Sequence, residues 1–207
     1  MKRLSIIIAV LASMVLAGCK SHECAPSALD VIMTRTSVRS FTGDPISKEQ
    51  LETILKAGMA APSAINIQPW RFVVVTDKEK IASVFANGFQ KDMYTQAGAV
   101  IVVCGQTTMM RKPFGQPDAP EEEQPNMFWY EDCSAVAQNI LLAVKALGLG
   151  AVWTAGYPAM ERVAPIAQAL GIPENVVPLC VIPVGVPAED PTPKDKWKPE
   201  NIHWEQW

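Results

Sequence analysis

Residues 35–41 read Arg35-Thr36-Ser37-Val38-Arg39-Ser40-Phe41, so two arginines bracket a pair of hydroxyl side chains. An arginine fork can bind two phosphate oxygens at once, and hydroxyl groups add short hydrogen bonds. The stretch follows an expected short helix that begins at Ser27, with Asp30 as the acidic half of a capping box. This pattern indicates a site for a phosphate group. Each arginine taken alone is more typical of a solvated surface charge, and it is the joint placement of the basic residues in the motifs that favours a phosphate site.

A second segment combines small residues with side-chain amides: Ala61-Pro62-Ser63-Ala64-Ile65-Asn66-Ile67-Gln68-Pro69-Trp70. It follows an expected helix that opens with a capping box at Ser47 and Gln50 and ends at Pro62. Small residues let the backbone approach a flat polar ligand, and an amide can both donate and accept. Gln68 and Trp70 are expected to brace the segment. Without the first segment, this one would be an ordinary helix end.

Alternating strands and helices follow, which predicts an α+β or α/β fold with one sheet flanked by helices. The expected strands are 70–76, 99–104, 151–154 and 177–186, and the expected helices are 81–89, 128–147 and one from near Pro158 to Gly171. The second strand is apolar throughout, as in the middle of a sheet, whereas Pro183 indicates that the last strand either ends there or runs along an edge. Residues 105–127 are expected to form a loop, and residues 187–207 an extended tail.

Composition limits the functional classes. The formal net charge is −3 and no basic stripe is present, so a nucleic-acid partner is not expected. The run Glu121-Glu122-Glu123 is typical of a solvated loop. The cysteines lack metal-ligand spacing, and the two histidines are far apart in the sequence; the cysteines are Cys19, Cys24, Cys104, Cys133 and Cys180. Neither a metal site nor a Cys/His nucleophile is predicted.

The first residues resemble an export signal. Lys2 and Arg3 precede an apolar run that is short for a membrane span, and the run ends in Leu16-Ala17-Gly18-Cys19. That ending resembles the lipobox of bacterial lipoproteins, which implies a signal peptide over 1–18, a tether over 19–26 lipidated at Cys19, and one domain over 27–207. The expected location is the cell envelope, outside the cytoplasm. An ordinary N-terminal membrane anchor is the alternative.

Four motifs in order resemble the nitroreductase family of FMN-dependent oxidoreductases. They are the stretch 35–41, the segment 62–70, the run Leu147-Gly148-Leu149-Gly150 leading to Gly156, and Pro193-Lys194-Asp195-Lys196. The resemblance covers nearly all of the chain after Leu29. It implies an α+β nitroreductase-like fold with a mostly antiparallel central sheet, an intertwined homodimer, and FMN at the subunit interface.

The resemblance also implies roles for individual residues. Those that would hold the FMN phosphate and ribityl chain are Arg35, Thr36, Ser37 and Arg39, closed from the C-terminal side by Lys194 and Lys196. Those that would reach the flavin from the other subunit are Pro62, Ser63, Ala64 and Asn66. Those whose backbone would lie near flavin N5 are Trp153, Thr154, Ala155 and Gly156. Many relatives carry arginine in place of Lys196, and Trp153 is equally typical of a core residue.

The implied reaction is ping-pong. A reduced donor, NAD(P)H or another, passes hydride to the flavin, and a nitroaromatic, quinone or similar electrophile then takes the electrons. The cofactor supplies the chemistry, and no side chain is expected to act as acid, base or nucleophile. Aromatic residues 128–130 either border the substrate channel or pack in the core. Dehalogenation or oxidation on the same fold, and a non-catalytic flavin-binding lipoprotein, remain alternatives.

Overall fold

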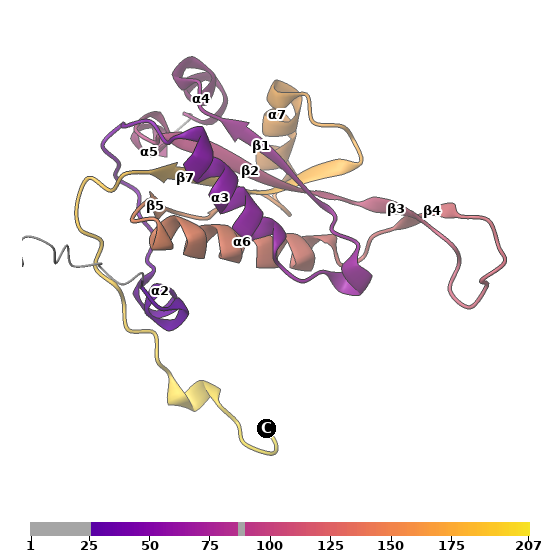
Figure 1. Ribbon diagram of the computed structural model, residues 1–207. Helices are drawn as coiled ribbons and strands as arrows, with labels where there is room; N and C mark the ends of the chain where they lie inside the picture. The colour runs from indigo at the N-terminus through magenta and orange to yellow at the C-terminus, as the bar shows by residue number, and fades with distance from the viewer. Residues whose placement is uncertain (1–25, 87–89) are drawn as a thin grey trace, which may run out of the picture.

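A strand that is buried on both faces, β2 (Ala99–Gln106), forms the middle of the fold. The computed structural model describes residues 26–86 and 90–207. In it, β2 pairs antiparallel with β1 (Trp70–Val75) on one side and with β7 (Val176–Gly185) on the other. The predicted central position of this strand and the antiparallel character of the sheet are both confirmed (Figure 1).

The last strand ends at Gly185, two residues after Pro183, but it does not run along an edge of the sheet, so that alternative is wrong. On the side away from β2, β7 pairs with β5 (Gly150–Ala151) and with β6 (Thr154–Ala155). These two short strands replace the single strand expected over 151–154. Pro183 lies opposite the interruption between them, because Val184 pairs with Ala151 and Val181 with Thr154. A residue without an N–H is accommodated at a gap in the pairing.

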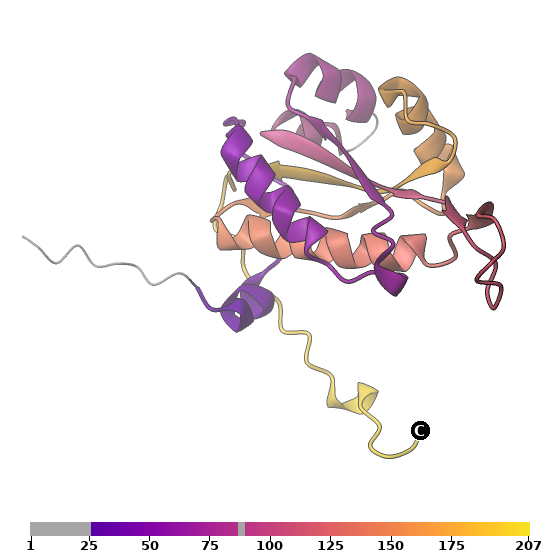
Figure 2. The same cartoon turned by 45° about the vertical axis from the view of Figure 1, so that its right-hand side comes forward.

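Helices cover both faces of the sheet (Figures 1 and 2). On one face lie α3 (Lys48–Met59) and α6 (Trp129–Ala146), and on the other lie α4 (Lys78–Phe85), α5 (Lys91–Thr95) and α7 (Met160–Leu170). The two cores follow the alternation of β2: Ile101 and Val103 face the first, whereas Val100 and Val102 face the second.

The predicted helix ends are mostly confirmed. Ser27 caps α2 (Ala28–Thr34) and Ser47 caps α3, each through a complete capping box. Helix α7 ends at Gly171, which has a left-handed φ of 64°. The helix expected over 81–89 differs: α4 ends at Phe85, residues 87–89 lie outside the described residues, and a separate helix, α5, follows.

The segment expected as a loop over 105–127 holds a hairpin instead. Strands β3 (Thr108–Arg111) and β4 (Glu122–Pro125) pair antiparallel and project from the body (Figure 2). The tail behaves as expected: after residue 188 it runs away past α2, with one 3-10 turn, η3 (Pro199–Asn201) (Figure 1). No helix in residues 26–86 and 90–207 is long and apolar enough to cross a bilayer.

Helix α6 is buried within its own chain. Val136, Ile140 and Val144 are almost fully covered, and an added Cβ on Gly58 of α3 would lie 2.9 Å from Ile140 Cγ1. The most deeply buried face of α6 therefore packs on α3 and the sheet. The proposed signal peptide, Cys19 and most of the tether fall outside the described residues.

Candidate cofactor-binding site

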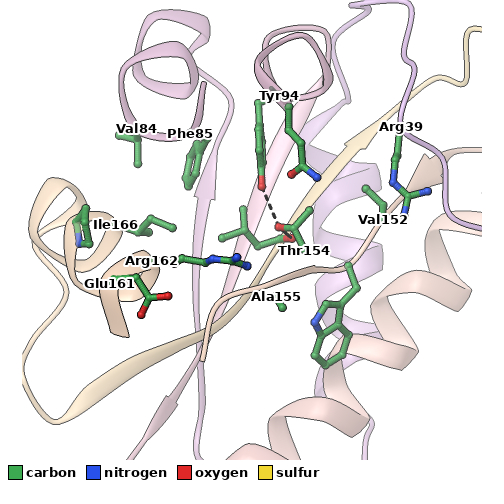
Figure 3. Close-up of a pocket in the computed structure, with 14 residues that line it drawn as sticks. Arg39, Val84, Phe85, Tyr94, Val152, Thr154, Ala155, Glu161, Arg162 and Ile166 are labelled. Atoms are coloured by element: carbon green, nitrogen blue, oxygen red, sulfur yellow. Dashed lines mark hydrogen bonds between the residues drawn. The ribbon is translucent and has the colours of Figure 1, made fainter. Parts of the chain in front are cut away.

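A cavity of about 590 Å³ lies beside β6, between that strand and the three helices α4, α5 and α7 (Figure 3). Four of the residues predicted from the sequence line it: Arg39, Trp153, Thr154 and Ala155. Apolar walls come from Phe85, Val152 and Ile166 among others, and charge comes from Arg39, Glu161 and Arg162. This combination suits a flat ring system with a polar edge.

Backbone pairing brings Arg39 to this cavity. The Val38 N–H donates to the carbonyl of Ala151 at 3.0 Å, which fixes the segment along β5. Phe41 then pairs with Pro187, and the Thr42 N–H donates to Val186 at 3.0 Å. Gly150 is required at the crossing, because an added Cβ would lie 2.7 Å from Val38 Cγ1. The first motif is thus attached to the sheet over the cavity.

Two hydrogen bonds join the polar side chains on the floor of the cavity to each other and to the sheet. The Thr154 hydroxyl lies 2.8 Å from the Tyr94 hydroxyl and donates to the Val181 carbonyl at 2.6 Å (Figure 3). Since Thr154 uses its only hydrogen on Val181, Tyr94 is the donor of the first bond. Burial raises the pKa of Tyr94, so the neutral phenol that makes this bond is favoured.

The backbone beside Ala155 is only partly free for a ligand. The N–H groups of Gly156 and Tyr157 both donate to the Leu179 carbonyl, at 3.1 and 3.0 Å. An added Cβ on Gly156 would lie 3.0 Å from that same carbonyl oxygen, so the chain passes too close for a side chain. Ala155 is exposed at the cavity wall. Of these residues, Gly156 shapes the loop and cannot offer its amide without losing a bond.

The remaining phosphate-binding candidates are not assembled within one chain. Arg35 is half-buried at the C-terminal end of α2, followed by Thr36 and Ser37, and none of the three lines the cavity. Lys194 and Lys196 are exposed on the tail. The tail begins close to the first motif, where the Ala188 N–H donates to Ser40 at 3.1 Å, and then leaves the body. Their joint role stays a prediction.

The second motif lies away from the cavity, at the start of α6. It forms a 3-10 turn, η1 (Ala64–Asn66), in which Ile65 and Asn66 have positive φ angles of 44° and 58°, and Gln68 follows with 55°. A β-branched residue in this region is a true outlier, and such strain costs of order 1–3 kcal/mol. Ser63 and Asn66 accept from the Gln68 backbone and side chain, each at 3.1 Å, so the bracing expected of Gln68 is confirmed.

Some cavity residues were not predicted. Tyr94 and Gln90 lie on or beside α5, and Glu161 and Arg162 lie on α7. The only sequence signal was for Tyr94, whose polar tip needs a partner when the ring is buried. Within the aromatic run 128–130, Trp129 lies in the core, and its ring centroid is 4.9 Å from that of Tyr157. Phe128 and Tyr130 are exposed. A substrate-channel role for the exposed pair stays a prediction.

Comparison with known proteins decides the family. Residues 32–91 and 82–186 match the nitroreductase family. The chain belongs to the nitroreductase family. This confirms the resemblance drawn from the four motifs, and the fold it implied.

Several relatives of this nitroreductase-family chain carry descriptive names. An NADH dehydrogenase/NAD(P)H nitroreductase of Methanothermobacter thermautotrophicus is 40% identical over 182 residues, which cover 86% of this chain and 87% of that protein. A crystal structure of the like-named protein from Bacteroides thetaiotaomicron is 42% identical, with a TM-score of 0.77 over 89% of this chain and all of that one. The NADPH:FMN oxidoreductase of Vibrio harveyi, solved in complex with NAD+, is 29% identical. Its TM-score is 0.70, and the match covers 87% of this chain and 77% of that one.

Proposed function

We propose that this chain is an FMN-dependent oxidoreductase that uses a reduced nicotinamide as donor and a nitroaromatic, quinone or similar electrophile as acceptor. The single observation that carries the proposal is the cavity, which gathers Arg39 and the loop 153–155 in a chain of the nitroreductase family. FMN supplies the hydride and electron transfer when bound, as redox cofactors do. The protein supplies position, charge and exclusion of water.

The residues present fit that cofactor. Apolar side chains such as Phe85, Val152 and Ile166 offer surface for a ring, and Arg39 offers charge-assisted hydrogen bonds to a polar edge or to phosphate. Arg162 adds a second cation on the α7 side (Figure 3). Two guanidinium groups around one cavity favour a ligand that is anionic, or that becomes anionic on reduction. Tyr94 and Thr154 keep the floor in place.

The cofactor is identified by its mass. The purified protein is expected to be yellow, and the flavin released on denaturation is expected to have the mass of FMN. Reduction by NADH or NADPH without oxygen should bleach the visible absorbance, and a nitroaromatic or a quinone should restore it. FAD in place of FMN, or no flavin after reconstitution, would overturn the proposal. A loaded protein that no donor reduces would favour the non-catalytic alternative.

The site is proposed to be completed by a second copy of the chain, with residues 62–66 of one subunit facing the cavity of the other. Apolar side chains without cover support a homodimer. They lie on α2, where Leu29 and Met33 are about three-quarters exposed, and on the tail, where Trp197 and Trp204 are similarly bare. Sedimentation velocity at the flavin absorbance tests this. A monomer that keeps its flavin would overturn it.

Export as a lipoprotein is a separate proposal, supported by Leu16-Ala17-Gly18-Cys19 after an apolar run of signal length. The thiol of Cys19 would carry the lipid and hold the domain at the cell envelope. Two or more acyl chains anchor stably, whereas one binds reversibly. Replacing Cys19 with Ser should leave an unacylated, unprocessed precursor. A native protein that starts at Met1 and incorporates no labelled fatty acid would exclude this location.

A further inference from the structure

The strained turn at η1 has its main support in a helix that lies 68 residues further along the chain. The Ala64 N–H donates to Oδ1 of Asp132 on α6, at 2.9 Å. Asp132 is 7% exposed, so this is a charge-assisted bond in a buried setting. The bonds from Gln68 to Ser63 and to Asn66 stay within the segment and cannot fix the turn relative to the rest of the protein. The Arg71 side chain of β1 also donates to the Gln68 carbonyl, but at a longer 3.4 Å and at the far end of the turn.

Three residues of the segment need this support. Ile65, Asn66 and Gln68 all have left-handed φ angles, and none is glycine. L-residues leave this region unless their surroundings hold them there. Ile65 is 68% exposed, so packing within the described chain holds it little. A fixed contact next to it, at Ala64, is therefore the means by which the body of the protein imposes the conformation.

Asp132 is a poor choice for stability alone. Its second carboxylate oxygen, Oδ2, is buried and has no hydrogen-bond partner among the described residues. Removing a charged oxygen from water without a partner is unfavourable. A neutral acceptor would hold the Ala64 amide at lower cost. The buried, unpartnered Oδ2 therefore lowers the stability of the folded protein, whereas Oδ1 holds the strained turn.

We infer that Asp132 is a positioning residue for the cofactor site: it accepts the Ala64 amide proton and thereby holds residues 63–68 in the shape that faces the flavin. It touches no ligand itself. The inference rests on the proposed function, in which residues 62–66 contact FMN in the partner subunit. A segment already held in its bound shape binds more tightly than one that must be ordered on binding. Asp132 should therefore affect cofactor affinity through the turn.

Two variants of Asp132 distinguish the effect of losing the hydrogen-bond acceptor from the effect of changing the side chain in any way. Asp132→Ala removes the acceptor, and it also removes the unpartnered oxygen and introduces a good helix former, so it is expected to fold. Asp132→Asn keeps an acceptor of the same size. Asn139→Ala is the matched control, because Asn139 lies on the same helix and donates to the Ala57 carbonyl at 3.1 Å, so its loss also removes a bond between α6 and a backbone group.

The first measurement needs no cofactor. Amide hydrogen exchange over residues 62–70 of the flavin-free protein should speed up in Asp132→Ala, and stay near the wild-type rate in Asp132→Asn and Asn139→Ala. The second is titration of the flavin-free protein with FMN, followed by flavin fluorescence. The alanine variant should bind about 10- to 100-fold more weakly, the range that loss of a hydrogen bond to a charged group corresponds to, and the asparagine variant should recover most of this.

A variant on the other side of the same bond provides a check if Asp132→Ala does not fold. Ala64→Pro deletes the donor, and the backbone suits it, since Ser63 before it is extended (φ −142°, ψ 154°) and Ala64 opens the turn. It should speed exchange across 66–70 and weaken FMN binding. Where both single variants fold, the double variant should lose no more affinity than the worse of the two, because both remove one bond.

The outcomes are distinct. Unchanged exchange and affinity in Asp132→Ala or in Ala64→Pro would overturn the inference, and so would equal losses in Asn139→Ala, which would show a general effect of destabilising α6. Wild-type protein that binds no FMN would overturn the proposed function instead. The exchange result would then still decide whether Asp132 holds the turn.

Discussion

The cavity beside β6 and the turn at η1 are built in opposite ways. The cavity is lined by side chains of one chain, on a floor where Tyr94 and Thr154 are hydrogen-bonded to each other and to the sheet. The turn projects from the start of α6, with Ile65 exposed and three left-handed residues in a row of four. The cavity is lined by residues of a single chain. The turn is held in place although nothing in the described chain covers it.

This difference shows how a shared site can be divided between subunits. A pocket can be rigid because the sheet supports it from below. A segment that must enter another subunit cannot be covered in its own, so its shape has to come from a few bonds at its base. In this chain α6 serves both regions, since its first turn carries Asp132 and its later turns pack under the sheet.

The largest effect is expected where the two regions share a support. Ile140 is fully buried within its own chain, between α6 and α3. Ile140→Asp should unfold the chain, because an unpaired buried charge costs about 3–5 kcal/mol, a large part of a domain's stability. Far-UV circular dichroism and sedimentation velocity check this. A folded monomer of Ile140→Asp would show instead that Ile140 serves subunit association.

The next effect tests the phosphate contacts that the cavity does not include. Arg35 is half-buried at the end of α2, whereas Lys196 is exposed on the tail. Arg35→Ala should weaken FMN binding by about 1.5–3 kcal/mol, since an arginine fork makes charge-assisted bonds. Lys196→Ala should weaken it less. Flavin titration of both variants measures the difference, and equal losses would contradict the assigned roles.

Gly150 tests the attachment of the first motif to the sheet. Gly150→Ala places a Cβ 2.7 Å from Val38 Cγ1, so Val38 and its neighbour Arg39 must shift. Overpacking of this kind costs about 1–3 kcal/mol, and FMN affinity should fall with stability. Gly43→Ala is the control: Gly43 has a φ of 89° but open space around it, so its loss should lower stability alone. Urea unfolding and FMN titration together separate the two variants.

The smallest effect concerns the cavity floor and depends on pH. Tyr94→Phe should cost about 0.5–1.5 kcal/mol at neutral pH through the lost bond to Thr154. Burial raises the pKa of Tyr94, so its stabilising contribution is present below the unfolded value of about 10 and is lost as pH rises through the higher folded value. Wild type and Tyr94→Phe should therefore converge in stability above pH 10. Stability is measured by urea unfolding at each pH. A difference in unfolding free energy between wild type and Tyr94→Phe that stays constant up to about pH 11 would contradict this.

Local chemistry in the sequence predicted much of the fold. The capping boxes at Ser27 and Ser47, the apolar run of β2 and the left-handed glycines that end α6 and α7 are all present. Each depends on residues close together in the chain. The errors arose where distant segments decide the outcome: Pro183 lies inside the sheet because the pairing of β7 is interrupted opposite it, and the β3–β4 hairpin forms by pairing across a loop of ten residues.

The candidate site divides along the same line. By itself the sequence determined the family and the residue types that suit a phosphate and a flat ring, because those depend on motifs that can be read in order. Only the tertiary structure decided that Arg39, Tyr94, Thr154 and Arg162 share one cavity, and that the amide of Ala64 meets a carboxylate 68 residues away. The physical reason is that helix α6 and strand β7 bring these groups together by packing and pairing, and neither leaves a signal in the spacing of the residues they join.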